Sequence, residues 1–228
     1  MALVVIALGS NVGAAGATSA AASGATAPAT VSATAPATAP ATAPATAPAS
    51  TPATAPAAAL AASPAAAAAT LWAAQERLAQ LPDLRVLRFS SIYTSEPAYV
   101  LEQPSFANAV LLADTSLAPL ELLQQLQAVE QEFGRDRSSQ AQHWGPRTLD
   151  LDIIDYAGVV SDAPKLTLPH PLALERDFVV TPLLEVAAGH ILANGAPVTR
   201  DKVTCGWVQM HQACEPNGQA LPYPKGGQ

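Results

Sequence analysis

One segment near the N-terminus limits what the rest of the chain can fold into. Residues 14–62 consist almost entirely of Ala, Thr, Pro and Ser with a little Gly, and 34–57 repeat Thr-Ala-Pro-Ala with small errors. Such a segment has almost nothing large to bury, so it cannot offset the entropy lost on ordering. We therefore expect a disordered or polyproline-II-like tether. It interrupts a single domain over 1–194, which is followed by a weakly patterned tail over 195–228.

The distribution of charge excludes several classes of protein. No Asp, Glu, Lys or Arg precedes Glu76, and the formal net charge is −7. An acidic chain lacks the basic surface that general nucleic-acid binding requires, and two cysteines cannot build a disulfide framework. The best apolar run, Ala2–Leu8, is far shorter than the roughly 18–20 residues of a membrane span. We therefore expect a cytoplasmic monomer that binds neither nucleic acid nor membrane.

Hydrophobic periodicity predicts alternating strands and helices. Strands are expected at Leu3–Leu8, Leu84–Ser95, Phe106–Leu112 and Leu149–Tyr156, and helices at 63–81, 119–133 and about Leu174–Ala187. Ser63 and Pro64 form a helix start, and Gly134 a helix end. The order β-α-β-β-α-β, then a helix, is typical of a ferredoxin-like α+β fold, an antiparallel sheet with helices packed on one side.

Two carboxylates stand one residue apart in the last of these strands. Asp150 and Asp152 alternate with the apolar residues Leu149, Leu151 and Ile153. Positions i and i+2 of a strand point to the same face, so these carboxylates can bridge one or two hard cations. The alternative is that they merely form the solvent face of a half-buried strand.

A cluster of cationic side chains surrounds this pair in the sequence. It comprises Arg135, Arg137, Arg147, Arg176, His143 and His170. Arginine binds phosphate through a planar fork of charge-assisted hydrogen bonds, so carboxylates beside arginines match the needs of a magnesium–polyphosphate site. The alternative is a solvated loop of unrelated charges. A P-loop is excluded because the chain contains no Gly-x-x-x-x-Gly-Lys-Ser/Thr.

Six short segments, taken in their order along the chain, together resemble the 6-hydroxymethyl-7,8-dihydropterin pyrophosphokinases, enzymes of folate biosynthesis. The segments are ALGSN (7–11), SSIYTSEP (90–97), QPSFANAV (103–110), GRDR (134–137), HWGPRTLDLDI (143–153) and LTLPHP (166–171). The resemblance covers about 3–12 and 63–190, and the block at 143–153 is its most specific part. It implies the same ferredoxin-like fold, and it identifies the apolar N-terminus as the first strand rather than a signal peptide.

The resemblance also implies roles for individual residues. Asp150 and Asp152 resemble the ligands of two Mg²⁺ ions, and with Arg135 and Arg147 they make up the expected catalytic set. The residues expected on the triphosphate of the co-substrate ATP are Arg135, Arg137, Arg147, Arg176 and His170. The residues expected around the pterin are Asn108 at its amide edge, Phe106 and Phe178 on its two faces, Trp144 closing over it, and Ser95 and Ala98 through their backbone. Glu130 stands near the site without an assigned role.

The implied reaction transfers a diphosphate. The pterin hydroxymethyl oxygen attacks the β-phosphorus of ATP and AMP leaves, a step that positioning and electrostatic stabilisation can carry without a general base. The loop around 135–146 is expected to close over ATP as a lid.

Three features of the chain depart from the family pattern. They are the insertion at 14–62, His143 in place of a stronger base, and the tail, whose Cys205, His211 and Cys214 lack zinc-site spacing. Two other functions stay open at this point. One is an inactive pterin- or nucleotide-binding module that uses the Pro-rich segment for docking, and the other is a different magnesium-dependent nucleotidyl transferase.

Overall fold

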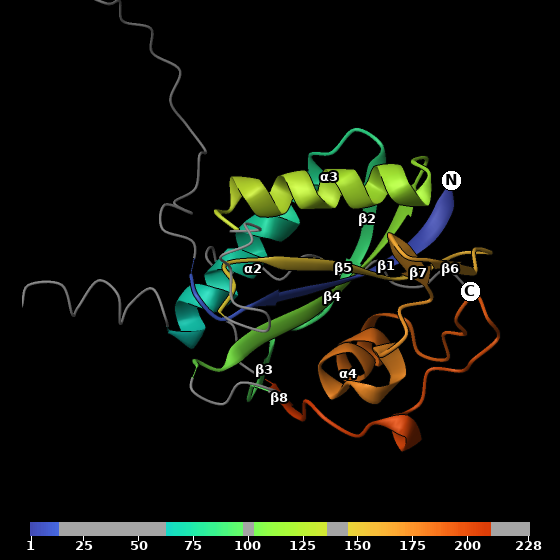
Figure 1. Ribbon diagram of the computed structural model, residues 1–228. Coiled ribbons are helices and arrows are strands. Elements are labelled where there is room, and N and C mark those ends of the chain that lie inside the picture. Colours follow the sequence, from blue (N-terminus) through green and yellow to red (C-terminus); the bar gives the residue numbers. More distant parts are fainter. Residues whose placement is uncertain (14–62, 98–102, 136–145, 211–228) are drawn as a thin grey trace, which may run out of the picture.

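The first strand of the chain becomes the centre of an antiparallel sheet. The computed structural model describes residues 1–13, 63–97, 103–135 and 146–210, so the expected tether lies outside the described residues (Figure 1). Strand β1, Ala2–Ser10, pairs antiparallel with β4, Phe106–Thr115, on one side and with β5, Asp150–Tyr156, on the other. Central strands are buried on both faces, which explains why this one reads as a continuous apolar run.

The other strands extend this sheet beyond β4. Strands β2, Leu84–Phe89, and β3, Tyr93–Ser95, both pair with β4, and β8, Val208–Met210, pairs with β3. The order β5-β1-β4-β2, antiparallel throughout, is that of the ferredoxin-like fold and confirms the expected class. A separate two-stranded sheet, β6 (Ser161–Ala163) with β7 (Leu166–Leu168), was not predicted from the sequence.

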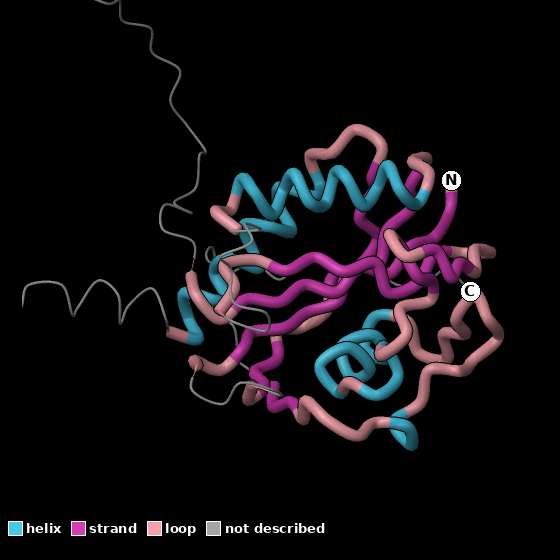
Figure 2. The backbone as a smooth tube through the Cα atoms, in the orientation of Figure 1, coloured by secondary structure: helices cyan, strands magenta, loops and turns pink. Residues whose placement is uncertain are grey.

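Helices cover both faces of the sheet (Figures 1 and 2). Helices α2, Pro64–Ala79, and α3, Pro119–Glu132, pack on one face, where Leu71 and Leu126 join the larger hydrophobic core. Helix α4, Asp177–Val186, lies on the opposite face over a second core that includes Val180. The expectation of helices on one side is therefore right for α2 and α3 and wrong for α4, because β1 and β4 present apolar residues to both faces.

Local signals fix several element ends as expected. The hydroxyl of Ser63 accepts a hydrogen bond from the Ala66 N–H at 3.1 Å, which caps α2. Gly134, with φ +79°, follows the end of α3 in a conformation that glycine adopts without strain. The short 3₁₀ helix Ala173–Glu175 precedes α4, so the predicted helix over 174–187 is divided in two at Arg176.

The long strand predicted at 84–95 is interrupted by a contact from a distant helix. The carboxylate of Glu185, on α4, accepts hydrogen bonds from the Ser91 N–H at 3.0 Å, the Ser91 hydroxyl at 2.8 Å and the Tyr93 hydroxyl at 2.9 Å. These bonds hold the residues between β2 and β3, while both strands run along β4 in the same direction.

The structure describes the C-terminal segment as far as Met210. Val198 and Val203 are buried in the core beneath α4, and 200–202 form a short 3₁₀ helix before β8. Cys205 is half-buried, while His211 and Cys214 lie outside the described residues. Among the helices of the described ranges, none combines the length and apolar character that crossing a bilayer demands.

Candidate functional site

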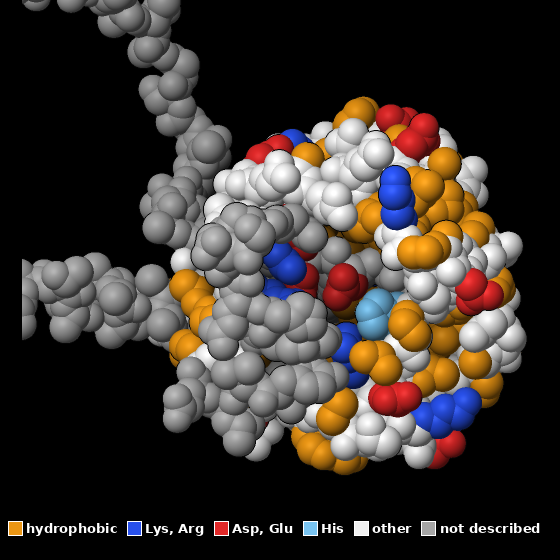
Figure 3. All heavy atoms as spheres, in the orientation of Figure 1, with side chains coloured by type: hydrophobic (Ala, Val, Ile, Leu, Met, Phe, Trp, Pro, Cys, Tyr) orange, Lys and Arg blue, Asp and Glu red, His pale blue; other side chains and the backbone are white. Residues whose placement is uncertain are grey.

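A cavity of about 320 Å³ opens where β1 ends and where β4 and β5 begin. Gly9 of β1 stands in register with Asn108 of β4 and with Asp150 of β5. A Cβ on this glycine would lie 3.8 Å from Asn108 Oδ1 and 3.8 Å from Asp150 Cβ. Because glycine has no Cβ, the space between these two side chains stays open. Figure 3 shows acidic, basic and histidine side chains gathered at a hollow of this face.

The structure brings together every described residue that the sequence assigned to the site. Ten of them line this one cavity: Ser95, Phe106, Asn108, Arg135, Arg147, Asp150, Asp152, His170, Arg176 and Phe178. The other predicted site residues, Ala98, Arg137 and Trp144, lie outside the described residues, as does His143. Most of the predicted lid, residues 136–145, also falls there.

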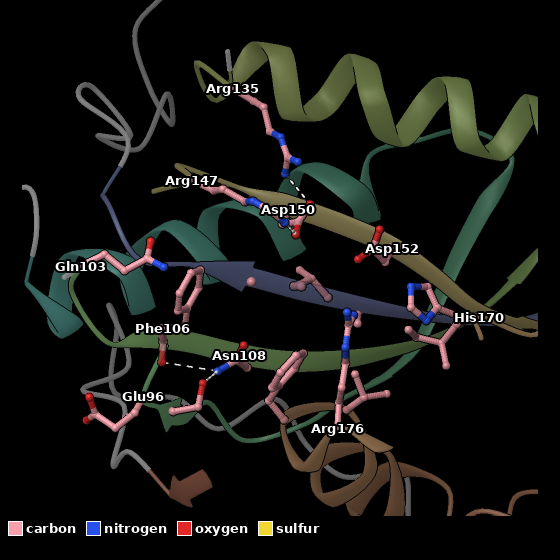
Figure 4. A pocket seen from close by; sticks show the side chains of 17 residues that line it. Glu96, Gln103, Phe106, Asn108, Arg135, Arg147, Asp150, Asp152, His170 and Arg176 are labelled. Carbon is pink, nitrogen blue, oxygen red and sulfur yellow. Dashed lines mark hydrogen bonds and ion pairs between the residues drawn. The ribbon is translucent and has the colours of Figure 1, made fainter. Parts of the chain in front are cut away.

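Charged side chains occupy one end of the cavity, as Figure 4 shows. Arg135, just beyond α3, and Arg147, just before β5, each form an ion pair with the Asp150 carboxylate. The Arg135 guanidinium also donates to the Leu149 carbonyl at 2.9 Å. Arg176 is 8% exposed, and its Nε has no hydrogen-bond partner among the described residues. Guanidinium groups that converge in this way are suited to an anionic ligand.

The two carboxylates of β5 differ in their ionisation. Burial alone would raise the pKa of the Asp150 carboxyl, but the guanidinium groups of Arg147 and Arg135 outweigh burial and hold that pKa below its ordinary value. Burial, together with the negative charges of Asp150 and Glu130, raises the pKa of Asp152 to about 7. At neutral pH Asp152 is therefore about half protonated, and a bound cation would favour its ionised form.

Glu130, on α3, contacts both β5 and Arg135. Its side chain is fully buried on α3 and accepts a hydrogen bond from the Leu151 N–H at 2.8 Å and one from Arg135 at 3.3 Å. The contacts join α3 to β5 between the two aspartates and fix the direction of Arg135. The sequence placed Glu130 near the site without a role, and these bonds show that it contacts the backbone of β5 and the Arg135 guanidinium.

His170 enters the cavity as a neutral imidazole. Burial, followed by the positive charge of Arg176, lowers the pKa of His170 to about 4. Its Nδ1 accepts a hydrogen bond from the Leu172 N–H at 3.2 Å, and its own backbone N–H donates to Ile154 at 2.8 Å. With Nδ1 as the acceptor, the ring proton lies on Nε2, which can donate to an anionic oxygen.

Aromatic and amide side chains occupy the other end. Phe106 begins β4, and Phe178 lies in the first turn of α4, where the Arg176 guanidinium carbon is 5.6 Å from its ring centroid. Asn108 is 5% exposed, and its Nδ2 donates to the Ser95 hydroxyl at 3.0 Å. A flat ring with polar edges fits between such groups.

Sequence reasoning missed two further residues. Asn11, fully buried after β1, donates through Nδ2 to Gln103 Oε1 at 3.0 Å and to the Pro104 carbonyl at 3.2 Å. Its Oδ1 accepts from the Arg147 N–H at 2.8 Å, and its own N–H donates to the Arg147 carbonyl at 3.1 Å. Asn11 therefore ties Arg147 to the loop of Gln103, which also lines the cavity. Both residues belong to motifs quoted above, but their partners are too distant in sequence to be predicted.

Paired carboxylates and arginines that meet at one cavity are the side chains that a transferase acting on a metal-bound polyphosphate requires. The family model for 7,8-dihydro-6-hydroxymethylpterin-pyrophosphokinase matches residues 57–188.

Curated relatives agree with the family model. A 2-amino-4-hydroxy-6-hydroxymethyldihydropteridine pyrophosphokinase of Haemophilus influenzae is 40% identical over 129 residues, which are 57% of this chain and 79% of the relative. One of Pseudomonas aeruginosa is 43% identical over 123 residues, 54% of this chain and 74% of the relative. One of Synechocystis is 44% identical over 117 residues, 51% of this chain and 58% of the relative.

The chain belongs to the 7,8-dihydro-6-hydroxymethylpterin-pyrophosphokinase family, and its activity is the pyrophosphokinase reaction of folate biosynthesis. The resemblance inferred from six short segments is thereby confirmed.

Proposed function

We propose that this one cavity carries the diphosphate transfer from ATP to the hydroxymethyl group of 6-hydroxymethyl-7,8-dihydropterin. In this proposal the triphosphate lies at the charged end and the pterin at the aromatic end. The observation that supports it most directly is the register of β1, because Gly9 stands between Asp150, a proposed metal ligand, and Asn108, a proposed pterin ligand.

Asp150 and Asp152 are the proposed ligands of two Mg²⁺ ions. Among the described residues no group of three or more His, Cys, Asp or Glu is arranged to hold a metal by itself. A pair of carboxylates is nevertheless enough, since Mg²⁺ commonly takes one or two from the protein and the rest from phosphate oxygens and water. The raised pKa of Asp152 fits this role, because burial and the neighbouring negative charges disfavour its ionised form, which a bound cation would stabilise. When bound, the ions would neutralise the phosphate oxygens.

Arg135, Arg147, Arg176 and His170 are the proposed triphosphate ligands. The Nε of Arg176, which has no hydrogen-bond partner within the described ranges, and the Nε2 proton of His170 supply donors that an anion can accept from. Arg135 and Arg147 form ion pairs with Asp150 in the structure. Binding of nucleotide with its cations therefore requires an exchange of partners, in which the carboxylate turns to the cation and the arginines turn to phosphate.

Phe106, Phe178 and Asn108 are the proposed pterin ligands. The hydrogen bond from Asn108 Nδ2 to Ser95 fixes the plane of the amide, which leaves Oδ1 to accept from an N–H at the pterin edge. Stacking between two phenyl rings would orient the heterocycle so that its hydroxymethyl group points toward Asp152 and the arginines. Ala98, Arg137 and Trp144 keep their expected roles as predictions.

The reaction then follows from placement and charge. A bond forms between the hydroxymethyl oxygen and the β-phosphorus, and the bond from the β-phosphorus to the oxygen bridging the α-phosphorus breaks. AMP leaves with that oxygen, and the hydroxyl proton passes to solvent. Arg135 and Arg147 stabilise the charge that develops on the phosphate oxygens. We also propose that the protein acts as a monomer in the cytoplasm.

Product analysis with ATP, Mg²⁺ and the pterin tests the proposal. We expect AMP and the pterin diphosphate in equal amounts, with turnover largely lost in Asp150→Ala and in Asp152→Ala. The matched control is Asp162→Ala, because Asp162 is an exposed aspartate on β6. An inactive binding module would release no AMP, and another nucleotidyl transferase would not depend on the pterin. Near-normal turnover in either cavity variant contradicts the metal assignment.

A further inference from the structure

A segment near the C-terminus runs directly along the start of α4. We call residues 200–208 the C-terminal strap. The carbonyl oxygen of Glu175 accepts hydrogen bonds from the Thr204 N–H at 2.9 Å and the Cys205 N–H at 3.1 Å. The Asp177 N–H donates to the Cys205 carbonyl at 3.0 Å. The strap is thus bonded to the backbone on both sides of Arg176.

A buried carboxylate fastens the strap at both of its ends. The side chain of Asp177 is 1% exposed and accepts a hydrogen bond from the Val208 N–H at 3.1 Å. It also pairs with the Arg200 guanidinium at 3.2 Å and accepts from the Thr181 hydroxyl at 2.6 Å. Val208 begins β8, so this contact continues into the pairing of β8 with β3. The path of the strap beneath α4 toward β8 is visible in Figure 1.

Between these anchors the strap comes unusually close to a ring of the cavity. Gly206 has φ +68°, and a Cβ at this position would lie 2.4 Å from Cδ1 and 2.7 Å from Cε1 of Phe178. Carbon atoms in contact prefer about 3.5–4.0 Å, so a methyl group here would force the ring to move by about 1 Å or more. Glycine is therefore required for the close approach as well as for the backbone conformation.

We propose that Gly206 is a positioning residue for the pterin. Its backbone packs against the Phe178 ring and holds it at the wall of the cavity, and the strap keeps Gly206 in place through Asp177 and Cys205. The inference rests on the proposed role of Phe178 as a stacking partner of the pterin. It adds that a segment outside the cavity lining, which the family model over 57–188 does not include, sets the position of that ring.

Gly206→Ala tests the proposal, with Gly189→Ala as its matched control. Gly189 has φ +77°, so alanine strains the backbone at both positions, but a Cβ on Gly189 has nothing within 4 Å. We expect Gly206→Ala to raise the KM for the pterin about fivefold, because the displaced ring loses part of its stacking, and to leave the KM for ATP within about twofold. Gly189→Ala should leave both KM values unchanged.

Phe178→Ala, alone and combined with Gly206→Ala, shows whether the effect passes through the ring. Alanine has no Cγ or Cδ atom, so in the Phe178→Ala background the methyl group added at position 206 has no ring to displace and should cause no further rise in the pterin KM. With the phenyl ring present, Gly206→Ala should lose more thermal stability than Gly189→Ala, because only the first substitution displaces the ring. This difference should disappear when the phenyl ring is absent. This stability comparison stays decisive even if Gly206→Ala alone is too unstable for kinetics.

The outcomes separate this inference from the proposed function. If Phe178→Ala weakens pterin binding while Gly206→Ala behaves like Gly189→Ala, the positioning role is wrong and the pterin site stands. If the effect of Gly206→Ala persists without the phenyl ring, the positioning role is also wrong. If Phe178→Ala leaves the pterin KM unchanged, the stacking assignment fails and the inference fails with it.

Discussion

Asp152→Asn should stabilise the protein while removing its activity. In the folded chain, burial and the charges of Asp150 and Glu130 raise the pKa of Asp152 to about 7 from its ordinary 3.8. A group whose pKa is raised by folding stabilises the fold at low pH, and that stability is lost as the pH rises through the folded value. Above pH 7 the metal-free fold therefore contains an ionised carboxylate that favours unfolding.

The magnitude follows from the separation of the two pKa values. Each pH unit between them corresponds to about 1.4 kcal/mol, so at pH 8 the ionised carboxylate lowers the free energy of unfolding by up to about 4 kcal/mol. Asparagine has the same shape and no charge. We expect Asp152→Asn to raise the free energy of unfolding at pH 8 by about 2–4 kcal/mol, and to match the unsubstituted protein near pH 4.

Urea denaturation at pH 4, 6 and 8 in the presence of EDTA measures this difference. The control is Asp162→Asn on the exposed β6, for which we expect a change below about 0.5 kcal/mol at each pH. Mg²⁺ with a non-hydrolysable ATP analogue should remove the advantage of Asp152→Asn, because the cation binds the carboxylate only in the unsubstituted protein. Equal stability at pH 8, or a gain that is the same at pH 4, would refute the electrostatic reasoning.

Three further outcomes are expected. Asn11→Ala should lower the free energy of unfolding by about 2–3 kcal/mol in urea denaturation. Its kcat/KM should also fall, because the Arg147 N–H loses its acceptor. Unchanged stability would contradict the role of these buried hydrogen bonds. Burial holds the pKa of His170 at about 4, so the folded protein should lose up to about 3 kcal/mol of stability as the pH falls from 6.5 to 4. His170→Gln should show a correspondingly smaller loss over the same range. Phe106→Leu should raise the KM for the pterin several-fold more than that for ATP, and equal effects on both would argue against stacking.

Much of the fold follows from signals that are local in sequence. The apolar run of β1, the Ser63 cap and the Gly134 helix end each act within a few residues, and each was predicted correctly. The break between β2 and β3 was not predicted, because the residues there bond to Glu185, which is distant in sequence and lies in a helix. Strand β8 was missed because three residues carry no detectable periodicity and its pairing with β3 is set by tertiary contacts.

The candidate site divides in the same way. The i, i+2 spacing of Asp150 and Asp152 was enough to predict a shared face, and both line the cavity. The difference in their pKa values could not be predicted, because it depends on which arginines reach Asp150 and on the burial of Glu130. Gly206 gave no sequence signal at all, since a turn glycine and a glycine beneath a cavity ring look alike until the ring is placed.

The ion pairs of Asp150 with Arg135 and Arg147 bear on the design of inhibitors. A compound that carries negative groups but brings no cation must compete with the Asp150 carboxylate for the same guanidinium groups. When such a compound binds, it leaves the Asp150 carboxylate without a positive partner, which costs free energy. Compounds that fill the aromatic end and extend a neutral hydrogen-bonding group toward His170 avoid this competition. The resting charge pattern of the cavity therefore favours drug-like molecules that resemble the pterin over mimics of free triphosphate.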